Sequence, residues 1–194
     1  MSKKSLLLSV LAVMLLFGLN SCSYNTMVEK EEAVGAAWSQ VENVYQRRAD
    51  LIPNLVNTVK GYAAHESETL ENVVSARSKA TQITVDPENL DPEQIKKFQQ
   101  AQGELSTTLG RLLAVTENYP ELKANENFMQ LQAQLEGTEN RIAVERKKFN
   151  ETAQSYNTYI RKFPNNLVAM MFSFEKKGYF EAEEGAEKAP EVKF

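Results

Sequence analysis

The side chains that enzymes use for acid-base and metal chemistry are sparse in this chain. His65 is the only histidine, and His65-Glu66 resembles the opening of a zinc-protease motif. That motif needs a second histidine four residues after the first, and position 69 is threonine. Four glutamates could supply carboxylates from neighbouring helices, as in di-iron bundles: Glu117, Glu121, Glu139 and Glu145. Because di-iron bundles use paired Glu-x-x-His motifs, we interpret these four as surface acids.

Nucleophilic catalysis and phosphate binding also lack support in the sequence. No Ser or Cys has a histidine base other than His65, and no glycine-rich phosphate loop occurs. One Cys and one His exclude an internal disulfide and a Cys/His metal cluster within the chain. The formal charge of −4 offers no basic footprint for nucleic acid. We therefore predict a protein that is not an enzyme and that binds no metal, cofactor or nucleic acid.

The single cysteine follows a segment with the features of a targeting signal. Lys3 and Lys4 precede a run of apolar or small residues at 6–19, and Asn20-Ser21-Cys22 follows. The run is short for a spanning helix, which needs ~20 apolar residues. Leu19-Asn20-Ser21 before Cys22 resembles a bacterial lipobox, which implies cleavage after Ser21 and a diacylglycerol on the Cys22 sulfur. Acyl chains there would hold the protein on a membrane. The alternative is an uncleaved anchor helix.

The composition predicts an all-α fold. Hydrophobic residues make up 42% of the 194, charged residues make up 25%, and Gly and Pro are few. The expected architecture is an elongated antiparallel bundle of long helices in one domain, at residues 26–174. A signal peptide at 1–21 and an acylated tether at 22–25 precede it, and a charged, mobile tail at 175–194 follows it. The helices are expected at about 26–80, 92–118, 126–163 and 166–173.

The first predicted helix carries an apolar seam with residues spaced alternately three and four apart. The seam comprises Trp38, Val41, Tyr45, Arg48, Ile52, Leu55, Val59, Tyr62, Glu66, Thr69, Val73, Ala76 and Ala80. Pro53 falls inside this helix and removes one hydrogen bond. Because the seam keeps its phase across Pro53, we expect a kink there and not a chain reversal.

The third long helix has a stripe that recurs every seven residues. It comprises Phe128, Leu135, Ile142, Phe149, Tyr156 and Phe163. The companion positions are mixed and include Glu145. A plain two-stranded coiled coil would bury that charge, so the pattern favours an antiparallel bundle.

Two sets of polar residues could bind a partner or join helices. Opposite the seam lie Arg47, Asp50, Asn54, Asn57, Gly61 and His65, which form either a solvated back face or a partner-binding face. Arg48 falls within the seam, so it needs a carboxylate or amide partner on a facing helix. Glu139 and Glu145, with Arg141 beside them, are candidates for that polar network. It would either fix the helix register or form a ligand site.

Several stretches resemble the LemA family of bacterial envelope proteins. They lie at 37–39, 47–66, 113–124, 128–132, 138–143, 156–157, 163–164 and 179–181. The resemblance runs from about Tyr24 to the C-terminus. It implies long antiparallel helices behind an N-terminal membrane anchor, and it brings no agreed enzymatic activity. Many members of the family keep an uncleaved anchor helix, and the lipobox here departs from that pattern.

Together these features predict a membrane-anchored, non-enzymatic scaffold or adaptor of the cell envelope. Its helical domain would lie outside the cytoplasm, on the periplasmic or surface side, and would bind another envelope protein through the polar helix face. After cleavage the chain would carry 20 basic and 26 acidic side chains, a formal −6, so attachment would rest on the anchor. The alternative is a binding module for a small or peptidic ligand between helices. Self-association also stays open.

We expect Cys22→Ala to leave an uncleaved precursor that incorporates no lipid, because the thiol is the acceptor that the signal requires. Metabolic labelling with a radioactive fatty acid and the gel mobility of the product test this. Normal processing of the variant would contradict the lipoprotein assignment.

Overall fold

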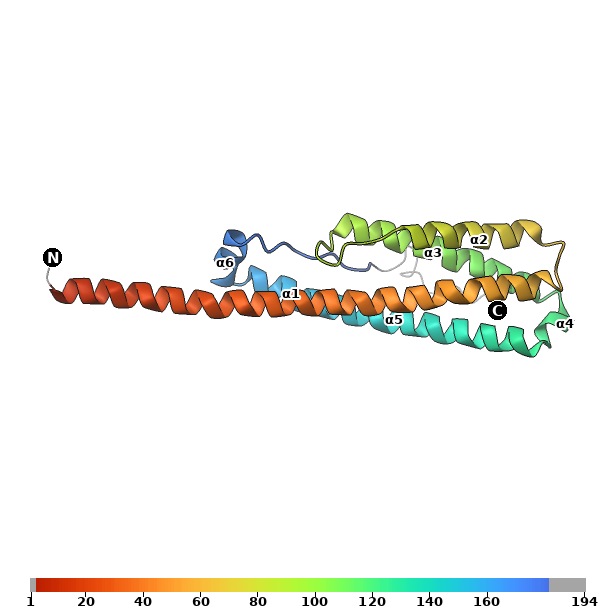
Figure 1. Ribbon diagram of the computed structural model, residues 1–194, viewed down its shortest axis with the longest axis horizontal. Helices are drawn as coiled ribbons and strands as arrows, with labels where there is room; N and C mark the ends of the chain where they lie inside the picture. The colour runs from red at the N-terminus through yellow and green to blue at the C-terminus, as the bar shows by residue number, and fades with distance from the viewer. Residues whose placement is uncertain (1–2, 182–194) are drawn as a thin grey trace, which may run out of the picture. The chain divides into compact units, whose positions relative to one another are not determined.

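The computed structural model describes residues 3–181, and it describes side chains from Ser23 onward. The described residues form six α-helices and no strand, so the all-α prediction is confirmed (Figure 1). The helices are α1 (Lys3–Lys60), α2 (Ser67–Gln82), α3 (Pro92–Thr116), α4 (Pro120–Lys123), α5 (Glu126–Arg161) and α6 (Asn165–Met171). The predicted signal segment 1–21 and Cys22 lie outside the described side chains, and residues 182–194 of the predicted tail lie outside the described residues. Across the described part, no helix combines the length and apolar character needed to cross a membrane.

The prediction of one helix from 26 to 80 is wrong. α1 ends at Lys60, and α2 begins at Ser67 after a reversal at 61–66. The reversal is closed by the amide of Ala63, which donates to the carbonyl of Val59 at 2.8 Å, and by the amide of Glu66, which donates to that of Ala63 at 3.1 Å. A lysine in the last turn followed by Gly61 is the helix-stop signal that marks this end.

Pro53 lies inside α1, and the chain does not reverse there, as expected. The other predicted helices agree with α3, α5 and α6 to within two residues at each end.

The described residues divide into two compact units. Unit 1 comprises residues 3–47, 87–89 and 137–177, and unit 2 comprises residues 48–86, 90–136 and 178–181.

The core of unit 1 forms between the first part of α1 and the second part of α5. Trp38 and Phe149 meet edge to face, with ring centroids 5.3 Å apart. Of the predicted seven-residue stripe, the members from Ile142 to Tyr156 are buried in this unit. Phe163, the last predicted member, is 80% exposed, because α5 ends at Arg161 and the helical register ends with it.

The core of unit 2 draws on five helices, α1 to α5. α2 and α3 lie side by side and run in opposite directions (Figure 1). The shared core comprises Ile52, Leu55, Val59, Ala63, Leu70, Val73, Ala76, Ala80, Ala101, Leu105, Leu109, Leu112, Leu122, Phe128 and Leu135. The predicted seam is buried up to Val59 and again from Val73, where α1 and α2 face the same core. Around the reversal the core takes Ala63 and Leu70 in place of Tyr62, Glu66 and Thr69. Tyr62 is the member of the seam that becomes exposed, since it falls in the turn.

The first described residues of the predicted mobile tail are packed, so the prediction of mobility is wrong for them. The backbone after residue 177 lies closely against the start of α3 in unit 2. The Gly178 amide donates to the carbonyl of Leu90 at 2.9 Å. A Cβ at this position would lie 2.8 Å from the Cα of Pro92 and 3.0 Å from Cδ1 of Ile95. Those separations are shorter than van der Waals contact, so the packing at this point requires glycine.

We expect Gly178→Ala to lower the free energy of unfolding by about 1–3 kcal/mol through overpacking against Pro92. Gly103→Ala is the matched control, because its Cβ meets nothing within 4 Å and it lies inside α3. That control should be neutral or stabilise by up to about 1 kcal/mol. Urea unfolding followed by circular dichroism measures both changes, and equal stabilities would refute the close-packing argument.

Candidate functional site

A groove lies between α1 and α2, within unit 2. It has a volume of about 480 Å³ and is lined by Val56, Lys60, Ala64, Ser67, Leu70, Glu71, Val74, Ser75 and Ser78. The volume falls within the range of small-molecule pockets, about 300–1,000 Å³. The groove exists because the chain reverses at 61–66 and brings α2 back beside α1. Since the sequence predicted one continuous helix here, it gave no indication of this groove.

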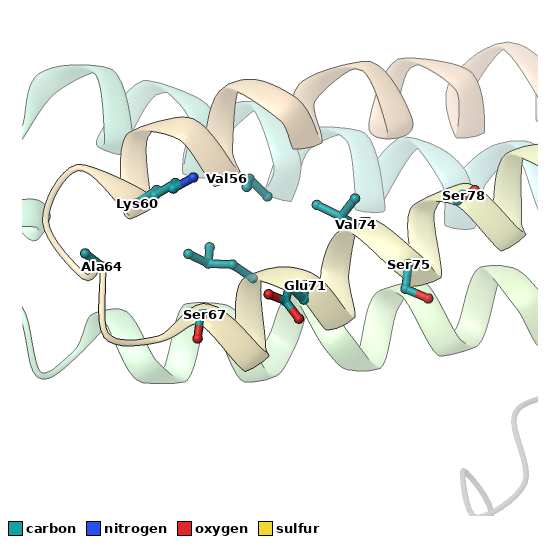
Figure 2. Close-up of a pocket in the computed structure, with 9 residues that line it drawn as sticks. Val56, Lys60, Ala64, Ser67, Glu71, Val74, Ser75 and Ser78 are labelled. Atoms are coloured by element: carbon teal, nitrogen blue, oxygen red, sulfur yellow. The ribbon is translucent and has the colours of Figure 1, made fainter.

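The lining is apolar in the middle and polar along its rim. Val56 from α1 and Val74 from α2 both project into the space between the two helices (Figure 2). Val74 is 52% exposed, whereas the neighbouring Val73 is fully buried in the core. A half-exposed valine inside a concave surface is apolar area that a bound partner could cover.

Two opposite charges and several small side chains complete the groove. Lys60 ends α1, and Glu71 lies one turn into α2 on the facing side (Figure 2). Ser67, Ser75 and Ala64 occupy little volume, so they leave room between the helices. The arrangement can bind an apolar segment and hydrogen-bond its polar flanks. Within the described residues, no group of three or more His, Cys, Asp or Glu side chains is arranged to hold a metal ion.

The predicted partner-binding face divides between a helix and a loop. Asp50, Asn54 and Asn57 lie exposed on α1. Gly61 and His65 are also exposed, but they belong to the reversal and not to the helix, because α1 ends at Lys60. Arg47 is exposed and belongs to unit 1. The six residues therefore do not share one helical face, and their role as a partner-binding surface stays a prediction.

Arg48 is buried in the seam of α1, as its position predicted, with 1% of its surface exposed. Its guanidinium donates to the Gln102 side-chain oxygen and, at 2.7 Å, to the Ser106 hydroxyl, both on α3. The Gln102 amide nitrogen in turn donates to the carbonyl of Ala80 at 3.3 Å, on α2. A facing helix thus supplies an amide partner to Arg48, as expected, and that partner is Gln102. Neither Gln102 nor Ser106 was identified from the sequence, because the sequence did not show which helix faces Arg48.

The acidic candidates of that network lie in unit 1. The interpretation of Glu145 as a surface acid is wrong, because its side chain is buried. It pairs with Arg141 at 2.9 Å and with Lys148 at 3.1 Å, all three on α5. Helical spacings of three and four residues bring these partners together. Glu145 is thus compensated on its own helix, and the pairing of Glu139 with Arg48 stays a prediction.

A second buried polar cluster surrounds Lys177 in unit 1. Its ammonium lies 2.7 Å from a Glu31 carboxylate oxygen and donates to the carbonyl of Glu88 at 2.8 Å. The backbone of Lys177 exchanges two hydrogen bonds with the Asn157 side chain, at 2.8 and 2.9 Å. Burial, followed by the nearby negative charge of Glu31, raises the pKa of Tyr156 above its usual range. The phenol therefore stays protonated at neutral pH, and the cluster holds the chain segment in place without supplying a base.

A smaller hollow of about 370 Å³ lies on unit 1 between α1 and α5. Its lining is polar: Lys30, Glu151, Gln154, Ser155, Thr158, Tyr159 and Lys162. The Lys30 ammonium donates to the Ser155 hydroxyl at 2.9 Å and lies 5.6 Å from the centre of the Tyr159 ring. Because Lys30 is engaged in these contacts, the hollow is a weaker candidate for binding than the groove between α1 and α2.

Comparisons with known proteins identify related chains. The model of the LemA family matches residues 37–194. The chain is 29% identical to the magnetosome protein MamQ 2 of Paramagnetospirillum magneticum, over 91% of this chain and 71% of that protein. It is 29% identical to the magnetosome protein MamQ of Magnetospirillum gryphiswaldense, over 90% of this chain and 71% of that one. It is 26% identical to protein LemA of Metamycoplasma hominis, over 82% and 69% respectively. These matches confirm the family resemblance seen in the sequence motifs.

We expect Arg48→Met to lower the free energy of unfolding by about 1–3 kcal/mol, since the buried Gln102 oxygen would lose a charged donor. The double variant Arg48→Met/Gln102→Leu removes both polar partners and should recover part of the loss. Chemical denaturation of the single and double variants measures the coupling. Unchanged stability of Arg48→Met would show that the buried network contributes nothing to the fold.

Proposed function

The chain belongs to the LemA family, and from that premise we propose that it is a membrane-anchored, non-enzymatic adaptor of the bacterial cell envelope. It would hold a short apolar segment of another envelope protein in the groove between α1 and α2. The half-exposed Val74 inside that groove is the observation that carries the proposal.

The shape of the groove favours a peptide segment over a compact small molecule. Its α2 wall runs from Ser67 to Ser78, which corresponds to about 16 Å of helix, or three turns of a docked helix. Amphipathic helices bind such grooves through apolar side chains spaced three or four residues apart. Val56 and Val74 offer the complementary apolar surface, whereas Leu70 lines the groove but is buried in the core.

The polar rim would set the orientation of the bound segment. Lys60 and Glu71 carry opposite charges on facing walls, so a segment with complementary charges would bind better in one direction than in the other. A small-molecule site usually needs several polar groups converging on one point. The groove is apolar along its middle instead.

The membrane attachment and the non-enzymatic character rest on the sequence. The lipobox-like Leu19-Asn20-Ser21-Cys22 supports a lipid anchor, and a domain after such an anchor would lie outside the cytoplasm. The chain has one histidine, and it is exposed in the reversal after α1. None of the names of the matched relatives denotes an enzyme class, which agrees with this part of the proposal.

We expect Val74→Arg to abolish the capture of a specific envelope protein when the anchored protein is crosslinked in its native membrane and the products are identified by mass spectrometry. The long charged side chain would occupy the groove without disturbing the core, because Val74 is already half exposed. Val144→Arg is the matched control, since Val144 is 46% exposed on α5 in unit 1. That control should capture the same partner at the wild-type level.

Other outcomes discriminate between the remaining hypotheses. Loss of the partner on changing Asn54 and Asn57 to glutamate, with capture by Val74→Arg intact, would place binding on the polar face of α1 and refute the groove. Capture of only further copies of the chain would replace the adaptor role by self-association.

A further inference from the structure

Large apolar side chains cover the outer surface of α6 and its flanks in unit 1. Phe163 is 80% exposed and Met170 is 76% exposed. We name as the α6 patch the exposed residues Tyr24, Phe163, Leu167, Met170, Met171 and Phe172. Exposed apolar surfaces of this extent on a folded protein mark sites of contact with a partner or a membrane.

The distribution of side chains on α6 is the reverse of that on an ordinary surface helix. Its buried residues are the small Val168 and Ala169, while Leu167, Met170 and Met171 point outward. Packing within the unit therefore uses the small side chains and leaves the large ones to the surroundings. Burial of large side chains is worth more than burial of small ones, so this orientation stabilises the protein only if something covers the patch.

The α6 patch includes Tyr24, which lies just after the N-terminal segment and packs against aromatic residues that follow α6. The rings of Tyr24 and Phe172 are 4.8 Å apart, and those of Tyr24 and Phe174 are 5.7 Å apart. Tyr24 follows Cys22 by two residues and the apolar run 6–19 by five, which is about 7.5 Å of helix. Whether the anchor is a lipid on Cys22 or the apolar run itself, the membrane surface would lie within a few ångströms of Tyr24.

The local charge also suits a membrane surface. Residues 161–176 contain Arg161, Lys162 and Lys176 against the single acid Glu175, a formal +2 in a chain of −4. Basic side chains beside aromatic and long apolar ones are the composition of segments that lie in the headgroup region. Basic side chains are attracted to the negative surface potential of an anionic leaflet. A protein partner would need a matching apolar surface that must itself lie against the bilayer, so lipid is the occupant that these features favour.

We propose that the α6 patch docks into the headgroup region of the membrane that holds the N-terminus. Phe163, Met170 and Phe172 would enter the upper acyl region, and Arg161 and Lys162 would contact lipid phosphates. This inference rests on the membrane attachment in the proposed function and is independent of the groove between α1 and α2. It gives the protein a second point of membrane contact, which restricts rotation of unit 1 about its anchor.

The test uses full-length, natively anchored protein in vesicles of phosphatidylcholine and phosphatidylglycerol whose acyl chains carry bromine near the headgroup. Bromine quenches tryptophan emission only at short range, so Met170→Trp should be quenched several-fold more than Val144→Trp. Val144 is the matched control because it is exposed and lies about 26 Å of helix before the end of α5. The native Trp38 is fully buried and contributes the same background to both variants. Phe172→Trp provides a second position in the patch and should be quenched as Met170→Trp is.

Flotation of the same vesicles separates docking from attachment. Protein that floats while both patch tryptophans are quenched no more than Val144→Trp would overturn docking and leave the attachment intact. Protein that does not float would overturn the attachment and docking together, while the crosslinking experiment on the groove would be unaffected as a separate test of partner binding.

Discussion

The buried guanidinium of Arg48 is the constraint on which the arrangement of unit 2 depends. A charge removed from water costs several kcal/mol unless hydrogen bonds compensate it. Here the compensation comes from Gln102 and Ser106 on α3, and Gln102 extends the network to the backbone of α2 at Ala80. The network thereby fixes how far α1, α2 and α3 are shifted along their axes relative to one another. A slip of either neighbour by one turn would leave buried polar groups unpaired, so the network selects a single register where apolar side chains alone would tolerate several.

The groove between α1 and α2 follows from that anchoring and from the small side chains on α2. Near the Arg48 end, Nε of Arg77 donates to the carbonyl of Ala49 at 2.7 Å and holds the last turns of α2 against α1. Ser67 and Ser75 on α2 are small side chains that line the groove, where larger residues would narrow it. The volume between the helices is a consequence of side-chain size at a few positions, with the backbone fixed at both ends. A preformed groove loses little conformational entropy on binding, which favours recognition of a partner.

Sequence periodicity was sufficient to predict that the chain is helical, but it did not predict where the chain reverses direction. A seam with residues three and four apart is satisfied by one long helix or by two helices that face a common core, and Val59 and Val73 are buried in either case. The stop signal at Lys60-Gly61 was present, but it competes with the continuity of the seam, and the seam was the longer pattern. The position of Arg48 in the seam allowed its burial and its need for a polar partner to be predicted. Gln102 could not be identified, because its approach to Arg48 depends on the reversal that the seam concealed.

The residues that carry the functional proposals are large apolar side chains that the core leaves exposed. Val74 is apolar beside the buried Val73 and yet half exposed, and Phe163 continues a stripe of buried residues and yet lies in the open. Phe163 is exposed because α5 ends at Arg161, just before it, whereas Val74 is exposed because it lies on the side of α2 that lines the groove. Folding alone gives no reason to retain a large apolar side chain at such a point, since its exposure adds nothing to stability. A surface that binds a partner or a lipid does give a reason, so deviation from the core pattern is better evidence of function here than any motif in the chain.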